Sequence, residues 1–119
     1  MEVFTVTKEN VENLKDFFSE TCLKNIDQEG FFTVGVYDDE GFVAGVMQFK
    51  VDSDQSSKCF GQLDYLYIHE DFEDSDASQT LIDELESILS ASGIHDRFVQ
   101  LPVGSDKKVF EFYRKLGFS

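Results

Sequence analysis

Residues 63–89 read L-D-Y-L-Y-I-H-E-D-F-E-D-S-D-A-S-Q-T-L-I-D-E-L-E-S-I-L, and this stretch decides the fold. Its first part, residues 63–68, is aromatic and aliphatic apart from Asp64, which predicts a central strand covered on both faces. Its last part has apolar residues at helical spacing, which predicts an amphipathic helix: Leu81, Ile82, Leu85, Ile88 and Leu89. A strand that leads into such a helix predicts a strand-helix-strand crossover. The connecting loop, residues 70–78, is where proteins of this class bind ligands.

The residues before the central strand predict a strand, a helix and a hairpin. Residues 3–6 form a short strand, and Thr7 stands where it can cap a following helix. The buried stripe of that single helix is Val11, Leu14, Phe17, Phe18, Leu23 and Ile26, and Gly30 ends it. Residues 31–37 and 42–51 are β-rich and joined by a turn in which Gly41 supplies a positive φ. Glycines inside the hairpin strands, Gly35 and Gly45, mark a bulge or the close approach of a neighbour.

The rest of the chain completes a mixed sheet. Residues 52–57 are predicted as a loop, and the central strand begins near Cys59 or Phe60. Gly93 closes the amphipathic helix, and residues 98–103 form another buried strand. Ser105 or Asp106 then caps a last helix, which has one apolar side and ends at Gly117: Val109, Phe110, Tyr113 and Leu116. The predicted fold class is therefore α/β (α+β), a mixed β-sheet flanked by helices.

Composition restricts the class of protein and its partners. The chain has 119 residues, 41% of them hydrophobic and 13 of them Phe, which predicts one domain over residues 1–119 with its own core. The formal net charge is −14, which argues against nucleic acid or an anionic membrane as a partner. A small cationic amine or a basic protein partner fits this charge better. The same acidity also fits a protein that self-repulsion keeps soluble.

The cysteines, histidines and N-terminus predict a cytoplasmic protein without a metal. Cys22 and Cys59 form no C-x-x-C pattern, and the N-terminus has neither a basic start nor a long apolar run. Both thiols are expected to be buried and inert in a reducing compartment. His69 and His95 stand apart from other ligand types, and the acidic loop lacks the Gly and Glu that a calcium-binding EF-hand requires.

Two motifs carry a resemblance to a known family. The last helix contains F-E-F-Y-R-K-L-G-F at residues 110–118, and the central region contains L-D-Y-L-Y-I-H-E-D-F at residues 63–72. Together, and in this order of elements, they resemble the GNAT superfamily of N-acetyltransferases. The resemblance implies a splayed sheet with acetyl-CoA between the central strand and the next parallel one. It also implies a pyrophosphate on the loop after the central strand and an amine that attacks the thioester directly.

The resemblance assigns roles to individual residues. Asp64 stands where related enzymes often have a general base, and Tyr113 where the family has the general acid that protonates the departing thiolate. The resemblance also implies that backbone groups of Tyr67 and Ile68 pair with the pantetheine arm of the cofactor. A structural interpretation stays open for both side chains: Asp64 as a hydrogen-bonded strand residue, and Tyr113 as a core aromatic with its hydroxyl at the surface.

The phosphate loop departs from the family pattern. The signature [RQ]-x-x-G-x-[GA] aligns on E-D-S-D-A-S, residues 73–78, so that the cofactor-binding positions there are Glu73, Asp74, Asp76, Ala77 and Ser78. Carboxylates replace the Arg or Gln and the middle Gly of the signature. In the family, that glycine allows the backbone to come close to a phosphate. No Lys or Arg lies between Lys58 and Arg97 to attract a phosphate. Asp76 can instead cap the following helix and occupy the N–H groups that a phosphate would bind. Asp106 stands at a position where the family commonly has Asn.

Two functions of different class follow. One is an N-acetyltransferase that acts on a small cationic amine, with weak acetyl-CoA binding. The other is a member with a degenerate loop that has lost the cofactor and serves as a binding module for a basic partner.

The resemblance also bears on association. Family members usually continue after L-G-F for two more strands, one of which lies beside the strand at residues 98–103. In this chain that strand is expected to have an open edge, which predicts a homo-oligomer with Leu116 and Phe118 in the contact. A different cover for the edge and a longer parent protein are the alternatives.

Overall fold

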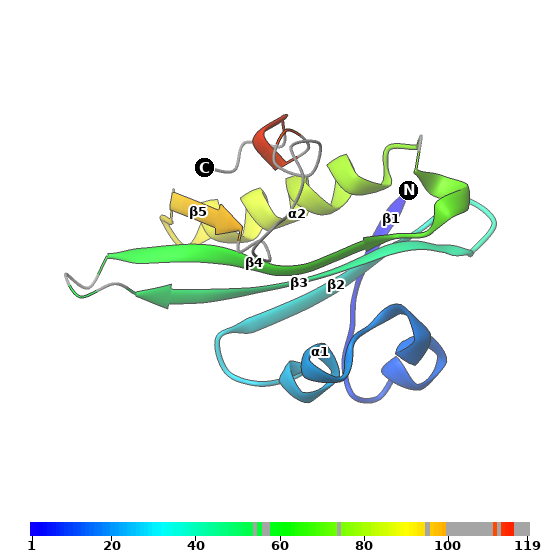
Figure 1. Cartoon of the computed structure of the whole chain (residues 1–119), viewed down its shortest axis with the longest axis horizontal. Coiled ribbons are helices and arrows are strands. Elements are labelled where there is room, and N and C mark those ends of the chain that lie inside the picture. Colours follow the sequence, from blue (N-terminus) through cyan, green and yellow to red (C-terminus); the bar gives the residue numbers. More distant parts are fainter. Residues whose placement is uncertain are drawn as a thin grey trace.

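A computed structural model describes residues 1–53, 55, 58–73, 75–94, 96–99, 111 and 113–115 (Figure 1). The elements run in the order β1 (Glu2–Thr5), 3-10 helix η1 (Val11–Phe17), α1 (Glu20–Asn25), β2 (Phe31–Tyr37), β3 (Val43–Ser53), β4 (Cys59–Ile68), 3-10 helix η2 (Glu70–Phe72), α2 (Ala77–Ala91) and β5 (Asp96–Val99). Residues 111 and 113–115 are also helical, in agreement with the predicted last helix.

The described strands form one mixed sheet. Its five strands lie in the order β1-β2-β3-β4-β5, antiparallel throughout except that β4 and β5 are parallel. Helix α2 connects these two parallel strands and covers one face of the sheet, whereas η1 and α1 cover the other (Figure 1). The predicted mixed sheet with helices on its faces and the predicted crossover are both confirmed.

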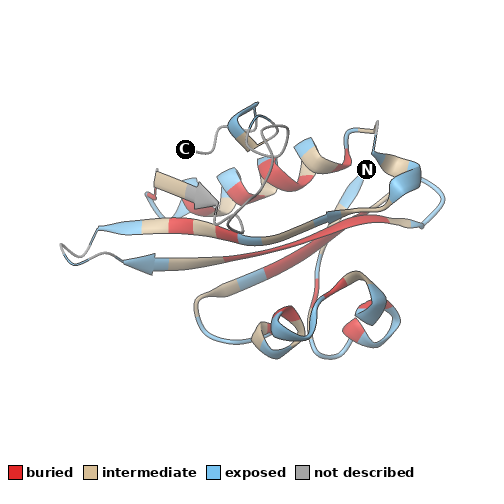
Figure 2. Ribbon diagram, viewed as in Figure 1, coloured by how far each residue is buried: buried red, intermediate tan, exposed pale blue. Residues whose placement is uncertain are grey.

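Each face of the sheet has its own core (Figure 2). On the α2 face, Leu81, Ile82 and Leu85 are fully buried against strand residues such as Phe49 and Leu63. Truncation of one such leucine to alanine typically costs about 2–5 kcal/mol. The second core holds η1 and α1 against the sheet through four buried residues of the predicted stripe, Val11, Leu14, Phe18 and Ile26, together with Cys22.

The predicted single N-terminal helix is wrong, because two short helices stand in its place. Phe18 is extended, with φ −118° and ψ 150°, and separates η1 from α1. The Ser19 hydroxyl then accepts a hydrogen bond from the Cys22 N–H at 3.3 Å and starts α1 as its N-cap. Thr7 caps no helix with its hydroxyl; instead its N–H donates to Asn10 Oδ1 at 2.8 Å. The buried apolar residues therefore continue from η1 into α1, although the helix itself is interrupted at Phe18 and Ser19.

The hairpin of β2 and β3 follows the prediction closely. Gly41 has φ +87°, and Asp38 Oδ1 accepts hydrogen bonds from the N–H groups of Glu40 and Phe42, each at 2.9 Å. Strand β3 begins one residue later than predicted and extends to Ser53, so the predicted loop starts too early. Phe42, left outside the strand, is 62% exposed.

The two strand glycines permit close approach. A Cβ on Gly35 stands 2.4 Å from the Phe4 ring, and one on Gly45 stands 2.7 Å from the Ile68 side chain and 2.9 Å from the Tyr67 carbonyl oxygen. The register between β2 and β3 shifts from Val36–Gly45 to Tyr37–Val43, which leaves Ala44, next to Gly45, as the extra residue. Close approach therefore holds for both glycines, and Gly45 also lies beside a bulge.

Helix α2 ends as predicted at Gly93. Gly93 has φ +73°, its N–H donates to the Ser90 carbonyl at 3.0 Å, and the N–H of Ile94 donates to the Leu89 carbonyl at 2.9 Å. This pair of bonds is a Schellman motif. Strand β5 begins at Asp96, two residues before the prediction. The predicted strand end at residues 100–103 and the predicted cap at Ser105 or Asp106 lie outside the described residues.

The cysteines differ in exposure. Cys22 is 5% exposed, as predicted, but Cys59 at the start of β4 is exposed, so the prediction of two buried thiols is wrong for Cys59. No helix among the described residues is both long and apolar enough to cross a membrane.

Candidate functional site

Only the first part of β4 pairs with β5 among the described residues, and we call the edge of β4 beyond Leu63 on that side the opening. The two strands pair from Phe60–Asp96 to Leu63–Val99, and in the described part of the chain the rest of β4 has no partner strand on that side. The N–H of His69 donates to the Ala44 carbonyl at 2.9 Å, toward β3. Because backbone groups alternate in direction along a strand, those of Ile68 point toward the opening. They can therefore pair with an extended chain laid into it.

The structure separates the two backbone positions that the sequence assigns to the cofactor. Tyr67 pairs with Val46 of β3, and its carbonyl oxygen lies close to Gly45. Its backbone groups thus belong to the β3 side of β4. Ile68, directly after it, presents its backbone to the other side.

Asp64 lies at a bulge in β4. The register with β3 passes from Gln48–Tyr65 to Phe49–Leu63, which leaves Asp64 as the extra residue. Its Oδ1 accepts a hydrogen bond from Gln62 Nε2 at 2.8 Å, and the side chain is exposed. The interpretation of Asp64 as a hydrogen-bonded strand residue is therefore correct as a description of its contacts, and the exposed carboxylate is also accessible to a substrate.

Asp64 faces the α1 side of the sheet. Burial raises the pKa of the Cys22 thiol; hydrogen bonds from Ser19 lower it, and the negative charge of Asp64 raises it again. Leu63, the neighbour of Asp64 in β4, belongs to the core beneath α2, so alternation along the strand turns Asp64 toward the other face, that of α1.

Two tyrosines of β4 hold the N-terminal helices against the sheet. The Tyr65 hydroxyl donates to the Phe17 carbonyl at 2.6 Å, and burial raises the pKa of this hydroxyl. The Phe17 ring meets Tyr67 edge-on, with centroids 5.7 Å apart. Sequence analysis missed Tyr65, although the alternation in Y-L-Y signals that both rings lie on one face.

Tyr113 lies on the other face. It is half-buried and packs against the core beneath α2, and burial raises the pKa of its hydroxyl. The predicted base Asp64 and the predicted acid Tyr113 thus lie on opposite faces of the sheet.

The loop after β4 is compact and acidic. The Ser75 hydroxyl donates to the Phe72 carbonyl at 2.5 Å and accepts from the Ala77 N–H at 3.2 Å. Asp76 occupies the N-cap position of α2 but makes no capping hydrogen bond with its side chain, so the prediction that Asp76 caps the helix is wrong. Ser75 binds the first helical N–H instead, because its hydroxyl is held there by Phe72.

The remaining loop positions differ in exposure. Glu73 and Asp76 are exposed, Ser78 is half-buried, and Ala77 is fully buried in the core. Asp74 and Asp106 lie outside the described residues.

The cations nearest in sequence to the loop are already paired. Lys58 Nζ lies 2.8 Å from Asp96 Oδ2, and Arg97 pairs with Glu86. A diphosphate at this loop meets exposed carboxylates instead of cations, while the opening beside Ile68 suits an extended amide-bearing chain. The site therefore fits the pantetheine half of acetyl-CoA better than its phosphate half. Within the described residues, no group of three or more potential metal ligands comes together.

Comparisons with known proteins agree with this geometry. The sequence profile of a family described as an acetyltransferase (GNAT) domain matches residues 2–119. A search of curated protein sequences finds no match.

Among solved structures, that of a probable acetyltransferase superposes with a TM-score of 0.82 at 15% identity, covering 100% of this chain and 90% of that one. An aminoglycoside antibiotic 6'-N-acetyltransferase from Acinetobacter baumannii superposes with a TM-score of 0.82 at 9% identity, covering 99% and 90%. A further acetyltransferase, solved with the bisubstrate analogue CoA-S-monomethyl-acetylneamine, superposes with a TM-score of 0.77 at 12% identity, covering 99% and 90%. At these identities the likeness shows the fold.

Proposed function

The chain belongs to the GNAT acetyltransferase family, and from this premise we propose that it transfers an acetyl group from acetyl-CoA to a small cationic amine, with a cofactor affinity that its acidic loop lowers. The observation that carries the proposal is this edge of β4: among the described residues its pairing with β5 extends only to Leu63, and the backbone of Ile68 points away from β3. The acetyl thioester of the cofactor supplies the group to be transferred.

The chain's own side chains supply proton transfer. Asp64 is exposed on the face of α1, where it can accept the proton of an ammonium substrate directly or through water. The Tyr113 hydroxyl is protonated at neutral pH, since the ordinary tyrosine pKa of 10.0 is raised further by burial, and it can therefore donate a proton to a departing thiolate. Asp64 and Tyr113 lie on opposite faces of the sheet, so in this proposal the base and the acid act on the bound amine and thioester from different sides.

Charge supports the choice of acceptor. A net charge of −14 attracts a cationic amine and repels anionic acceptors. The structural neighbour from Acinetobacter baumannii is an aminoglycoside acetyltransferase, and aminoglycosides are amine-bearing acceptors of this general class.

The loop sets the cofactor affinity. Glu73 and Asp76 replace the residues that favour a diphosphate, and neither is in an ion pair with a described Lys or Arg. We expect a dissociation constant for acetyl-CoA above about 10 μM at physiological salt.

A second candidate function is a non-catalytic module that binds a basic protein partner. The acidic loop and the overall charge favour it. It differs from the first in a simple observable: it does not bind acetyl-CoA at any usable concentration.

Calorimetric titration with acetyl-CoA tests the proposal, followed by an acetylation assay with a panel of small amines. Saturable weak binding and transfer to an amine are expected. Absence of binding up to about 5 mM sinks the acetyltransferase proposal and leaves the binding module.

Variants separate loop chemistry from a blocked opening. Replacement of the loop residues (Glu73→Arg, Asp74→Gly, Asp76→Gly, Ser78→Gly) should raise cofactor affinity at least tenfold. A control with the same change in net charge, Glu9→Lys with Glu29→Lys, alters exposed residues outside the loop and should change affinity far less. Equal affinity in the parent and the loop variant indicates that the opening itself excludes the cofactor.

A further inference from the structure

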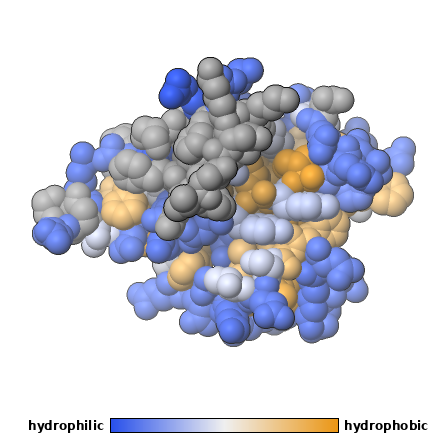
Figure 3. Space-filling model, in the orientation of Figure 1, coloured by the Kyte–Doolittle hydropathy of each residue, from blue (hydrophilic) through white to orange (hydrophobic). Residues whose placement is uncertain are grey.

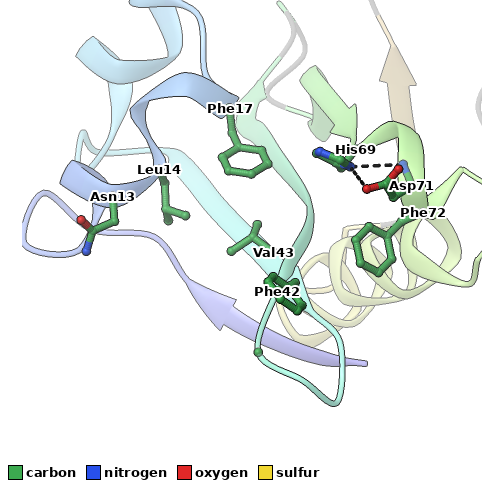
Figure 4. A pocket seen from close by; sticks show the side chains of 9 residues that line it. Asn13, Leu14, Phe17, Phe42, Val43, His69, Asp71 and Phe72 are labelled. Atoms are coloured by element: carbon green, nitrogen blue, oxygen red, sulfur yellow. Dashed lines mark hydrogen bonds and ion pairs between the residues drawn. The ribbon is translucent and has the colours of Figure 1, made fainter.

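A second cavity lies at the end of β4, apart from the opening beside β5. It has a volume of about 410 Å³ and lies among η1, the turn between β2 and β3, and the segment after β4 (Figure 4). None of its lining residues comes from β5 or from residues 73–78. His69, which lines it, follows Asp64 by five positions, or about 16 Å along a strand. The cavity therefore shares no lining residue with residues 73–78 of the loop or with the proposed base, although His69 directly follows Ile68.

The walls of this pocket are apolar and aromatic. Figure 4 shows the rings of Phe17, Phe42 and Phe72, which come from three separate segments, around the pocket, together with Leu14 and Val43. Figure 3 shows apolar surface over the sheet and the N-terminal helices within a mostly hydrophilic exterior. Phe42 is 62% exposed, which is unusual for a ring of this size. Aromatic rings bury an apolar ligand and also attract a cation at their faces.

The polar groups of the pocket favour a positive ligand. His69 Nδ1 accepts a hydrogen bond from the Asp71 N–H at 3.1 Å and lies 3.7 Å from Asp71 Oδ2. The Asp71 side chain is 77% exposed and brings a carboxylate to the rim. The lining contains no Lys or Arg.

We propose that this pocket binds an organic cation with an apolar body, its ammonium group beside Asp71 and its body among Phe17, Phe42 and Phe72. A polyhydroxylated amine fits less well, because few polar groups line the walls: Asn13, His69 and Asp71. The site goes beyond the proposed acetyl transfer, since binding here needs neither acetyl-CoA nor Asp64.

The test uses benzylammonium as the probe and benzyl alcohol as its uncharged counterpart of similar size. Both are titrated into the parent protein without acetyl-CoA, by calorimetry and by ¹⁵N NMR. We expect benzylammonium to bind about tenfold more tightly than the alcohol. Amide shifts should move at residues 41–43 and 69–72.

Matched variants locate the site. Asp71→Asn and Phe42→Ala change exposed side chains of the pocket, and each should weaken benzylammonium binding about five- to tenfold. Asp39→Asn removes the same charge from the adjoining turn without touching the pocket, and Phe32→Ala removes a partly exposed ring of β2. Both controls should bind as the parent does.

Several results overturn the proposal. These are equal affinity for the amine and the alcohol, an equal loss in Asp39→Asn and Asp71→Asn, shifts confined to other surfaces, or no saturable binding up to about 10 mM. Failure of the acetyl-CoA titration does not affect this outcome, because the cofactor is absent from the experiment.

Discussion

Asp64 offers the sharpest test of chemistry at the scale of a single residue. Asp64→Asn keeps an Oδ1 that can still accept from Gln62, so the local hydrogen bond survives while the base is lost. If the chain acetylates amines, we expect this variant to lower kcat/KM about 10²- to 10³-fold at neutral pH. The loss should shrink as pH rises, because more of the acceptor is then already deprotonated.

The matched control for that variant is Asp83→Asn. Asp83 lies on α2 and also accepts from a glutamine Nε2 at 2.8 Å, so the same substitution is made far from the opening. An unchanged rate in Asp64→Asn, or an equal loss in both variants, returns Asp64 to a purely structural role. Tyr113→Phe, measured alongside, should lower turnover with little effect on cofactor binding.

The two thiols should react very differently. Cys59 is exposed and should be alkylated at once in the native protein, whereas Cys22 is buried with its pKa raised and should react only after unfolding. Because the pKa of Cys22 is raised on folding, the unfolded chain releases that proton first. The free energy of unfolding should therefore fall as pH rises above the ordinary thiol pKa of 9.0.

Mass spectrometry of a short alkylation pulse checks the first part, and urea unfolding between pH 8 and about 10.5 checks the second. Cys22→Ala should flatten the alkaline slope in part, since Tyr65, whose pKa burial also raises, still contributes. Rapid alkylation of both Cys22 and Cys59 in the native protein contradicts the prediction that Cys22 is protected by burial.

At the scale of elements, the strand glycines set how closely β1, β3 and β4 approach. Gly45→Ala places a methyl group 2.9 Å from the Tyr67 carbonyl oxygen, a backbone atom that cannot move without disturbing the β3–β4 ladder. Gly35→Ala meets only the outer end of the Phe4 ring, on edge strand β1. We expect a destabilisation of about 2–3 kcal/mol for the first and about 1 kcal/mol for the second.

Urea denaturation of both variants beside the parent measures this difference. Gly41→Ala serves as a reference for backbone strain alone, because Gly41 has φ +87° and no atom within 4 Å of its added Cβ. If Gly35→Ala proves the more costly change, β1 is held more rigidly than its position at the edge implies.

Elements that the sequence predicted well have periodic patterns with clear ends. Strand β2 matches residues 31–37 because an aromatic and β-branched run lies between turn residues, and α2 matches because its stripe ends at Gly93. The N-terminal helix was mispredicted because its apolar spacing continues through Phe18, where the chain is extended. Periodicity reports which residues are buried, and a local competitor such as Ser19 decides where the helix breaks.

The candidate site was predicted only in part for a similar reason. The position of Asp64 in a strand follows from the sequence, but its bulge depends on register with β3, which no local pattern in β4 reveals. The capping role assigned to Asp76 belongs to Ser75, because Ser75 is fixed by a bond to Phe72 within the turn. The aromatic pocket combines segments from residue 13 to residue 72, and such a combination requires the fold.

For the whole molecule, self-association stays a prediction. Strand β5 is the outermost strand on its side of the described sheet, and an exposed strand edge favours pairing with a second copy. We expect sedimentation equilibrium at about 100 μM to show a dimer. A clean monomer at that concentration excludes even a dimer with a dissociation constant of about 10 μM.

Net charge makes a prediction that joins the two proposed sites. The chain has 24 acidic and 10 basic residues, so the whole surface repels an anionic cofactor and attracts an organic cation. Salt shortens the range of both effects, from a Debye length of about 30 Å at 0.01 M to about 8 Å at 0.15 M. Between these ionic strengths, acetyl-CoA affinity should rise several-fold while benzylammonium affinity falls. At a phosphate site built from Lys and Arg, added salt lowers the affinity for acetyl-CoA instead, because it weakens the attraction between the cations and the phosphates.

Titration of both ligands into one protein preparation, in KCl from about 10 to 150 mM, measures the two slopes. The variant with four loop substitutions should flatten or reverse the acetyl-CoA slope, since its added arginine and lost carboxylates act at short range. It should change the benzylammonium slope less than the acetyl-CoA slope, because none of the substituted residues lines that pocket. Acetyl-CoA affinity that falls with salt in the parent protein contradicts the account of the loop, because it requires cations around the phosphates that the described part of the chain does not place there.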